Sequence, residues 1–208
     1  MKTRILVNSL VILACVGAAP VMAKGPNNPG GPQVAAPSQA TVATLTTVAA
    51  DDLLKMREEE KVARDVYLKL YARWKTPVFS QIAASEQIHF DALGAKIRTC
   101  GLTDPALPGQ GDFTNTDLQN AYDQLSASGL TSPVQALTVG ATIEDMDISD
   151  LQTAITDTDQ AALRTTYQNL MEGSKNHLRA FVKLLRAAGV QYRPQYIDEA
   201  LFDAIVGG

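Results

Sequence analysis

Four segments of this 208-residue chain repeat apolar residues at alternating spacings of three and four. That period places them along one face of a helix, the face that packs against a core. The segments are residues 51–74, 77–101, 133–155 and 159–189. Each face carries polar residues near its middle. The pattern predicts an all-α fold in which four helices bring polar side chains to one depth.

The first segment has a single acidic residue on its apolar face. That face comprises Leu53, Met56, Glu60, Ala63, Tyr67, Leu70 and Trp74. Glu58 and Glu59 fall beside it, and we expect them on a solvated, charged face. A buried carboxylate without a partner costs several kcal/mol. Glu60 therefore requires a partner, and a cation is the simplest one.

The second segment places Glu86 and His89 three residues apart on its apolar face. Positions i and i+3 of a helix lie side by side. In the third segment Glu144 lies on the apolar face, and Asp147 follows one turn later. The fourth carries His177, whereas Glu172 falls on its other side.

The two histidines of the chain, His89 and His177, both fall in this set of polar residues. A single histidine on an apolar face is more often a core residue than a metal ligand. Two histidines with three carboxylates at one depth favour ligands, because buried carboxylates repel one another unless a cation neutralises them. The pattern therefore predicts a site for one or two divalent ions.

The connections differ in length. A short link at Thr76-Pro77 joins the first two helices, so they should be antiparallel neighbours. Residues 102–131 contain a Pro/Gly-rich loop and a short predicted helix at 116–127, long enough to return along the second helix. We therefore expect the second and third helices to be parallel, joined by one crossover. A tail with Ile197, Leu201 and Ile205 predicts a short final helix.

The N-terminal 50 residues have two distinct compositions. Residues 1–23 read as a signal peptide, with Lys2 and Arg4 before an apolar stretch and a small-residue cleavage site ending at Ala23. Lipidation at Cys15 is a weaker alternative. Residues 24–50, with four prolines, three glycines and no acidic residue, read as a flexible linker. Residues 51–208 then form one domain of an exported protein, periplasmic or extracellular.

Charge and cysteine content exclude some functions. Without Lys2 and Arg4, 16 basic residues stand against 22 acidic ones, and no basic stripe suggests a nucleic-acid partner. Cys100 is the one cysteine after the signal segment, so an internal disulfide is excluded. After that segment no apolar run is long enough to span a membrane.

Three motifs resemble those of the ferritin-like superfamily. Glu60-Lys-Val-Ala-Arg-Asp-Val-Tyr67 resembles the Glu-x-x-Ala-Arg-x-x-Tyr signature of rubrerythrin-type proteins, and Glu86–His89 resembles their Glu-x-x-His. The stretches GATIEDMDISDL and GSKNHLRAF resemble a bacterial branch known as a domain of unknown function. The resemblance covers residues 51–189. It implies a ferritin-like four-helix bundle with a di-iron or di-manganese centre.

Carried over by position, the resemblance implies five ligands: Glu60, Glu86, His89, Glu144 and His177. One position departs from the family pattern. The second Glu-x-x-His of the family corresponds to Ser174-Lys-Asn-His177 here, so a carboxylate is missing. Asp147 is the residue that could replace it. Otherwise the second metal position is weak, or the site holds one ion.

The leading hypothesis is an exported di-iron or di-manganese protein that reacts with peroxide or dioxygen. Tyr67 could relay an electron or hydrogen-bond a ligand, although a packing role is at least as common for such a residue. One alternative is a periplasmic protein that binds or buffers a divalent metal without turnover. Another is a helical interaction module. A homodimer stays open.

Overall fold

The computed structural model describes residues 45–207, which form six α-helices and no strand. The all-α prediction is confirmed for this part of the chain. The helices are α1 (Thr47–Trp74), α2 (Pro77–Thr99), α3 (Thr116–Gly129), α4 (Pro133–Asp157), α5 (Ala161–Ala187) and α6 (Glu199–Val206). The predicted signal segment, Cys15 and most of the predicted linker lie outside the described residues.

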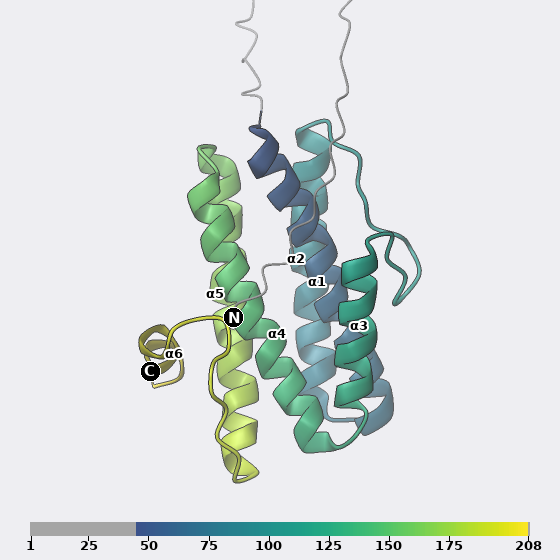
Figure 1. The fold of residues 1–208 in the computed structure, drawn as a ribbon, viewed down its shortest axis with the longest axis vertical. Helices are drawn as coiled ribbons and strands as arrows, with labels where there is room; N and C mark the ends of the chain where they lie inside the picture. The colour runs from purple at the N-terminus through teal and green to yellow at the C-terminus, as the bar shows by residue number, and fades with distance from the viewer. Residues whose placement is uncertain (1–44, 208) are drawn as a thin grey trace, which may run out of the picture. The chain divides into compact units, whose positions relative to one another are not determined.

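Four long helices lie side by side, with α1 packed along α2 and α4 along α5 (Figure 1). α1 also contacts α4, and α2 contacts α5. In Figure 1, α1 and α5 run in one direction and α2 and α4 in the other. The second and third long helices are therefore parallel, and α3 lies in the crossover against α1 and α4.

α1 begins four residues before the expected position. The side chain of Thr46 accepts a hydrogen bond from the N–H of Ala49 at 3.1 Å, and the helix continues from Thr47. The end of the predicted linker thus belongs to α1. The sequence signal was missed because this first turn is uncharged, whereas acidic residues usually mark a helix start. Lys75, in the left-handed region with φ 56°, ends the helix.

Ser132 with Gln135 predicts a capping box at the start of α4, and Asp157 with Gln160 predicts a cap before α5. The structure differs from both predictions in detail. Ser132 accepts from the N–H of Gln135 at 3.0 Å, but the Gln135 side chain donates to Ser128 Oγ, so the capping box is only half formed. At the next junction α4 continues through Asp157, and Gln160 takes the position before α5. Thr158 Oγ1 accepts the Gln160 N–H there. Asp157 is thus a helix residue and not a cap.

The core consists of two apolar clusters. One surrounds the touching rings of Tyr67, Phe79 and Phe181, and the other includes Leu53, Leu93 and Tyr167. On α1 the second cluster ends at Met56 and the first begins at Val62. On α5 the boundary falls between Leu170 and Leu178. The polar residues predicted to share one depth lie between the two clusters.

The crossover loop is tied to α1 by charged side chains. Lys61 and Asp65 form an ion pair of 2.7 Å whose side chains are fully buried, and Lys61 Nζ also donates to the carbonyls of Gly109 and Asp112. Nearer the start of the loop, Arg57 pairs with Asp104 at 2.9 Å. The loop therefore covers a face of α1 that the sequence pattern assigned to solvent.

Glu58 and Glu59 are accordingly not solvated, which corrects the expectation for them. Glu58 is buried on the side of the crossover, and Glu59 is largely buried beside Lys55, with which it pairs at 3.0 Å. The helical period gives the direction of a side chain but not what a distant loop places over it.

The tail after α5 is fixed to α4 through one carboxylate. Asp145 is fully buried and accepts from the hydroxyl of Tyr192 and from the backbone N–H groups of Gln195, Tyr196 and Ile197. α6 then packs against α5.

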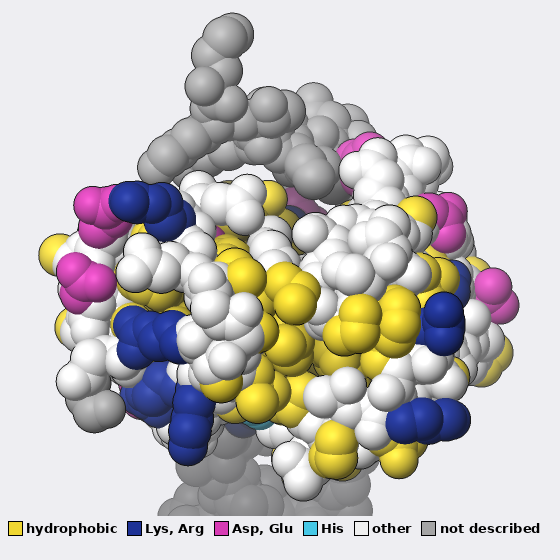
Figure 2. All heavy atoms as spheres, turned by 90° about the horizontal axis from the view of Figure 1, so that it is seen from below, with side chains coloured by type: hydrophobic (Ala, Val, Ile, Leu, Met, Phe, Trp, Pro, Cys, Tyr) yellow, Lys and Arg dark blue, Asp and Glu magenta, His cyan; other side chains and the backbone are white. Residues whose placement is uncertain are grey.

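Within residues 45–207 no helix combines the length and the hydropathy needed to cross a membrane. Hydrophobic side chains also gather at the centre of one end of the molecule (Figure 2).

Candidate metal centre

Carboxylates and imidazoles from four helices converge between the two apolar clusters. Two groups of three potential ligands form there, and within each group the ligand atoms lie within 4.8 Å of one another. The first group is Glu60 from α1 with Glu86 and His89 from α2. The second is Glu86 with Glu144 from α4 and His177 from α5. Glu86 belongs to both.

The two groups have matching geometry around Glu86. Its Oε2 lies 2.8 Å from Nδ1 of His89, and its Oε1 lies 2.8 Å from Nδ1 of His177. Each Nδ1 also has a second carboxylate oxygen at 3.4 Å, from Glu60 for His89 and from Glu144 for His177. The two imidazole rings are 5.6 Å apart.

Several of these atoms have no partner in hydrogen-bond geometry. They are Glu60 Oε1, Glu86 Oε1 and the Nδ1 atoms of both histidines, all buried. Buried polar atoms are almost always hydrogen-bonded, because an unpaired one costs free energy. Here nitrogen and oxygen atoms approach one another closely without donor–acceptor alignment. Atoms that share a cation have this arrangement, so the residues fit a metal site.

Without a cation, protons carry the compensating charge. Burial opposes charge on Glu86, but the close contacts with the imidazoles of His177 and His89 outweigh it and lower the Glu86 pKa to about 2. Burial likewise lowers the pKa of each imidazole, and the neighbouring carboxylates outweigh it. The net pKa is about 11 for His89 and about 10 for His177.

The other carboxylates shift in the opposite direction. Burial, reinforced by the charge of Glu86, raises the pKa of Glu144 to about 7. Burial and then the charge of Asp147 raise the pKa of Glu60 well above its ordinary value. Asp147 is itself raised, by burial first and then by Glu144. The cluster holds more negative charge than its environment tolerates, which is the condition that a divalent cation relieves.

Two side chains outside the triads hydrogen-bond to ligand candidates. The hydroxyl of Tyr67, fully buried, donates to Glu144 Oε1 at 2.5 Å. Ser85 Oγ lies 3.0 Å from Nε2 of His177, on the ring edge opposite Nδ1. Such contacts fix the orientation of a ligand. Tyr67 was predicted from the sequence, whereas Ser85 was not, because its only signal was its place directly before Glu86.

Asp147 lies outside both triads. The fully buried Ser174 hydrogen-bonds through its hydroxyl to Asp147 Oδ2, and the same Oγ lies 3.0 Å from the Leu170 carbonyl. The structure thus brings five of the six expected ligands together in triads and places the sixth beside them. Glu172 pairs with Lys175 at the surface, as expected of a residue excluded from the site.

Gly173 is a second residue at the site that was not predicted from the sequence. A Cβ atom added there would lie 2.6 Å from Cε1 and Nε2 of His89, closer than real Cβ contacts. The glycine therefore makes room for the imidazole against α5. A glycine inside a helix is unfavourable unless packing requires it, and that cost was the available signal.

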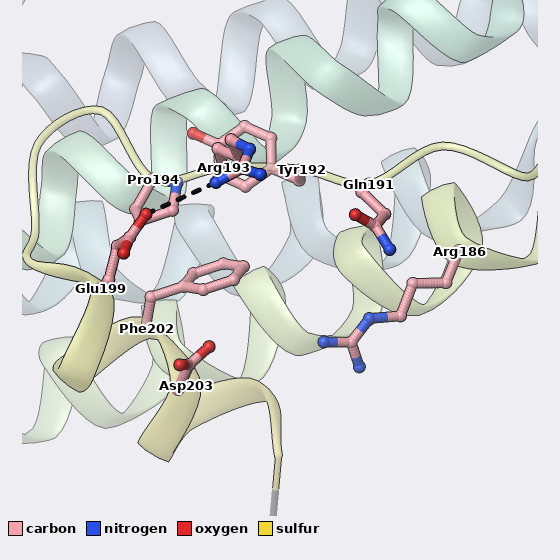
Figure 3. Close-up of a pocket in the computed structure, with 8 residues that line it drawn as sticks. All are labelled: Arg186, Gln191, Tyr192, Arg193, Pro194, Glu199, Phe202 and Asp203. Atoms are coloured by element: carbon pink, nitrogen blue, oxygen red, sulfur yellow. Dashed lines mark ion pairs between the residues drawn. The ribbon is translucent and has the colours of Figure 1, made fainter.

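A separate pocket of about 380 Å³ opens beside the tail (Figure 3). Its lining residues are Arg186, Gln191, Tyr192, Arg193, Pro194, Glu199, Phe202 and Asp203. None of them belongs to the triads. Its one ion pair, Arg193 with Glu199 at 3.6 Å, is highly exposed and therefore weak.

The fold and the site define an all-helical protein with a buried cluster of carboxylates and histidines. Residues 49–208 match the family described as "Uncharacterized protein domain (DUF2202)", and the chain belongs to that family. This agrees with the domain-of-unknown-function branch that the motifs suggested.

The chain is 46% identical over 157 residues to the uncharacterized protein MJ0754 of Methanocaldococcus jannaschii, a match that covers 75% of this chain and 85% of that protein. A crystal structure of the hypothetical protein MJ0754 superimposes with a TM-score of 0.76 at 45% identity, covering 76% of this chain and 91% of that one. This relative is archaeal, whereas the motifs suggested a bacterial branch.

Proposed function

We propose that this protein is a ferritin-like four-helix bundle that binds a pair of divalent transition-metal ions, iron or manganese, between α1, α2, α4 and α5. The observation that carries the proposal is the shared Glu86, each of whose oxygens faces a different histidine. One carboxylate between two triads suits two neighbouring ions. Paired glutamates and Glu-x-x-His motifs on facing helices are how such bundles hold their metals.

The donor types suit iron or manganese. Each position would receive carboxylate oxygens and one imidazole nitrogen, and neither triad includes a thiolate. Carboxylate and imidazole ligands are compatible with both metals, whereas sites for softer metals use sulfur. Glu86 would bridge, Glu60 and His89 would complete one position, and Glu144 and His177 would complete the other.

The metal pair would supply electron exchange with peroxide or dioxygen. The surrounding residues provide the conditions for that chemistry. The burial of the ligand atoms excludes bulk water, and the carboxylates compensate the positive charge of an oxidised metal. The Tyr67 hydroxyl orients Glu144 and lies within hydrogen-bond distance of a proton on the Glu144 carboxylate. Tyr67 is thereby the candidate for moving a proton or an electron at this position.

A second function, metal binding or buffering without turnover, is favoured by one observation. Ser174 stands where a further bridging carboxylate is expected, and its hydroxyl bonds to Asp147. Only Glu86 then bridges, so fewer negative charges would stabilise an oxidised metal pair. A purely structural role, as an interaction module, has less support because it leaves the unpaired buried atoms of both triads without a reason.

The decisive experiment measures metal content. The protein should be expressed with its native N-terminus, purified without chelator and measured by plasma mass spectrometry, together with His89→Ala and His177→Ala. Glu172→Ala, which removes an exposed glutamate outside the site, is the matched control. About two irons or manganeses per chain are expected in the wild type and the control, with fewer in both histidine variants. Metal-free wild-type protein with unchanged variant stability would refute the proposal.

A stopped-flow experiment then separates the two functions. Ferrous protein is mixed anaerobically with peroxide or with dioxygen, and the absorbance of ferric iron is followed. Repeated turnover with a reductant supports the redox function, and metal release without oxidation supports buffering.

Export to the periplasm or the cell exterior belongs to the same proposal, since it rests on the residue pattern of the N-terminal segment. Cell fractionation of the full chain tests it. We expect the mature protein to begin at Lys24 and to be recovered outside the cytoplasm.

A further inference from the structure

The two halves of the site are supported differently, although their ligand sets match. From this difference we infer that the position formed by Glu144 and His177 binds its cation more tightly, and fills first, than the position formed by Glu60 and His89. The inference rests on the proposed function, because it assigns an order to the same two positions.

The His177 ring is fixed by a hydrogen bond. Ser85 Oγ lies 3.0 Å from its Nε2. When Nε2 carries the proton and donates to Ser85, Nδ1 is left with a lone pair directed at Glu86 and Glu144. A hydrogen bond on the distal nitrogen of a metal-binding histidine sets its tautomer and orientation in this way.

Glu144 is oriented by a hydrogen bond to the carboxylate oxygen that does not face His177. Tyr67 donates to Oε1, which leaves Oε2 facing Nδ1 of His177 at 3.4 Å. The tyrosine ring is itself fixed, with its centroid 5.4 Å from that of Phe181 and 6.3 Å from that of Phe79. Glu144 and His177, the two ligands that belong to this position alone, are therefore oriented before a cation binds.

The other position lacks these supports within the described residues. Oε1 of Glu60 is buried without a hydrogen-bond partner. The polar contacts of His89 run through Nδ1 alone, to Glu60 and Glu86. What limits the ring on its far side is the close approach to Gly173, which is steric and not directional. Both ligands must be ordered by the cation itself.

Preorganised ligands bind more tightly because less conformational freedom is lost on binding. Loss of an outer hydrogen bond to a metal ligand typically weakens binding by about 10- to 100-fold. Two such bonds support the His177 position and none supports the His89 position. The His89 position is therefore the one whose cation exchanges, with the cation at His177 staying in place.

An anaerobic cobalt(II) titration tests this order. The full chain is stripped with chelator, dialysed and titrated while the visible absorption of bound cobalt is recorded. Wild type should bind two equivalents in two resolved steps. Ser85→Ala and Tyr67→Phe should each weaken the first step by about 10- to 100-fold. Gly173→Ala, which displaces His89, should weaken only the second.

Two further variants separate positioning from general damage. Ser85→Thr keeps the hydroxyl and should restore the first step. Ser80→Ala removes a hydroxyl on the same helix that donates to the Pro77 carbonyl, and should leave both steps unchanged. Circular dichroism confirms that each variant is folded.

The outcomes are distinguishable. Failure of the wild type to bind any cobalt would refute the proposed function itself. Two equivalents bound in one unresolved step, or a first step insensitive to Ser85→Ala and Tyr67→Phe, would leave the metal site standing and overturn the order. An effect of Ser85→Ala on the second step would reverse the assignment.

Discussion

Glu86 illustrates how much one residue does in this site. It is buried, and each of its two carboxylate oxygens contacts a different histidine. Each of the other four triad residues belongs to one triad only. A change at Glu86 therefore affects both positions, whereas a change at Glu144 affects one.

Glu86→Gln should abolish the binding of both ions, because an amide supplies one neutral oxygen in place of two that share a charge. Glu144→Gln should retain about one ion per chain, since the Glu60–His89 triad keeps all its members. Metal content measured on both purified variants checks the difference. Equal metal loss in the two variants would contradict a bridging role for Glu86.

Protonation gives a second prediction for individual residues. In the metal-free protein the pKa values of His89 and His177, about 11 and 10, lie above their ordinary 6.5, and that of Glu144, about 7, lies above 4.5. The folded chain then binds more protons than the unfolded chain, so its stability falls as pH rises. The histidine contribution is complete below pH 6.5 and is lost as the pH approaches 10.

Glu86 acts in the opposite sense, since its lowered pKa of about 2 adds stability above pH 4.5 that is lost as the pH falls toward 2. We therefore expect the chelator-treated protein to be most stable near about pH 5 and to weaken toward about pH 9. Urea unfolding at several pH values measures this. A stability independent of pH over that interval would show that the protons are not held as described.

At the scale of elements, α4 connects the site to the tail through consecutive residues. Glu144 points into the site, and Asp145 accepts one side-chain and three backbone hydrogen bonds from the tail. The backbone N–H groups of Gln195, Tyr196 and Ile197 have this carboxylate as their acceptor. The pairing keeps the segment before α6 on the surface of α4.

Asp145→Ala should lower the free energy of unfolding by roughly 3 kcal/mol, because several donors lose a charged acceptor in a buried place. Asp198→Ala is the matched control. It removes a carboxylate that caps α6 through a single bond to Leu201 N–H, and it should cost about 1 kcal/mol. Urea unfolding monitored by circular dichroism compares the two. Similar costs for both variants would mean that Asp145 does not fix the tail.

At the scale of the whole molecule, the buried carboxylates and histidines of the site form a polar layer. This layer divides the core into two apolar clusters. In the metal-free state this layer contributes repulsion and unpaired atoms where a continuous core would contribute packing. A bound cation would convert it into a connection between all four long helices. Metal binding and folding should therefore be coupled.

Saturating iron(II) or manganese(II) should raise the melting temperature of the chelator-treated protein. A cation present at 100 times its dissociation constant stabilises the folded state by about 2.7 kcal/mol per site. Calorimetry at increasing metal concentration checks this, with His89→Ala and His177→Ala as controls that should respond less. A melting temperature unaffected by metal would mean that the residues of the polar layer do not bind it.

The sequence by itself determined the helices and the depth of their polar residues. The spacings of Glu60, Glu86 with His89, Glu144 and His177 follow the helical period, which is local, and the short and long connections restricted the helix directions. Tertiary structure decided which atoms meet. The contacts of Ser85 with His177 and of Ser174 with Asp147, and the burial of Glu58, depend on helix rotation and on the path of the crossover loop. Those are set by packing between distant segments, which periodicity within one segment does not encode.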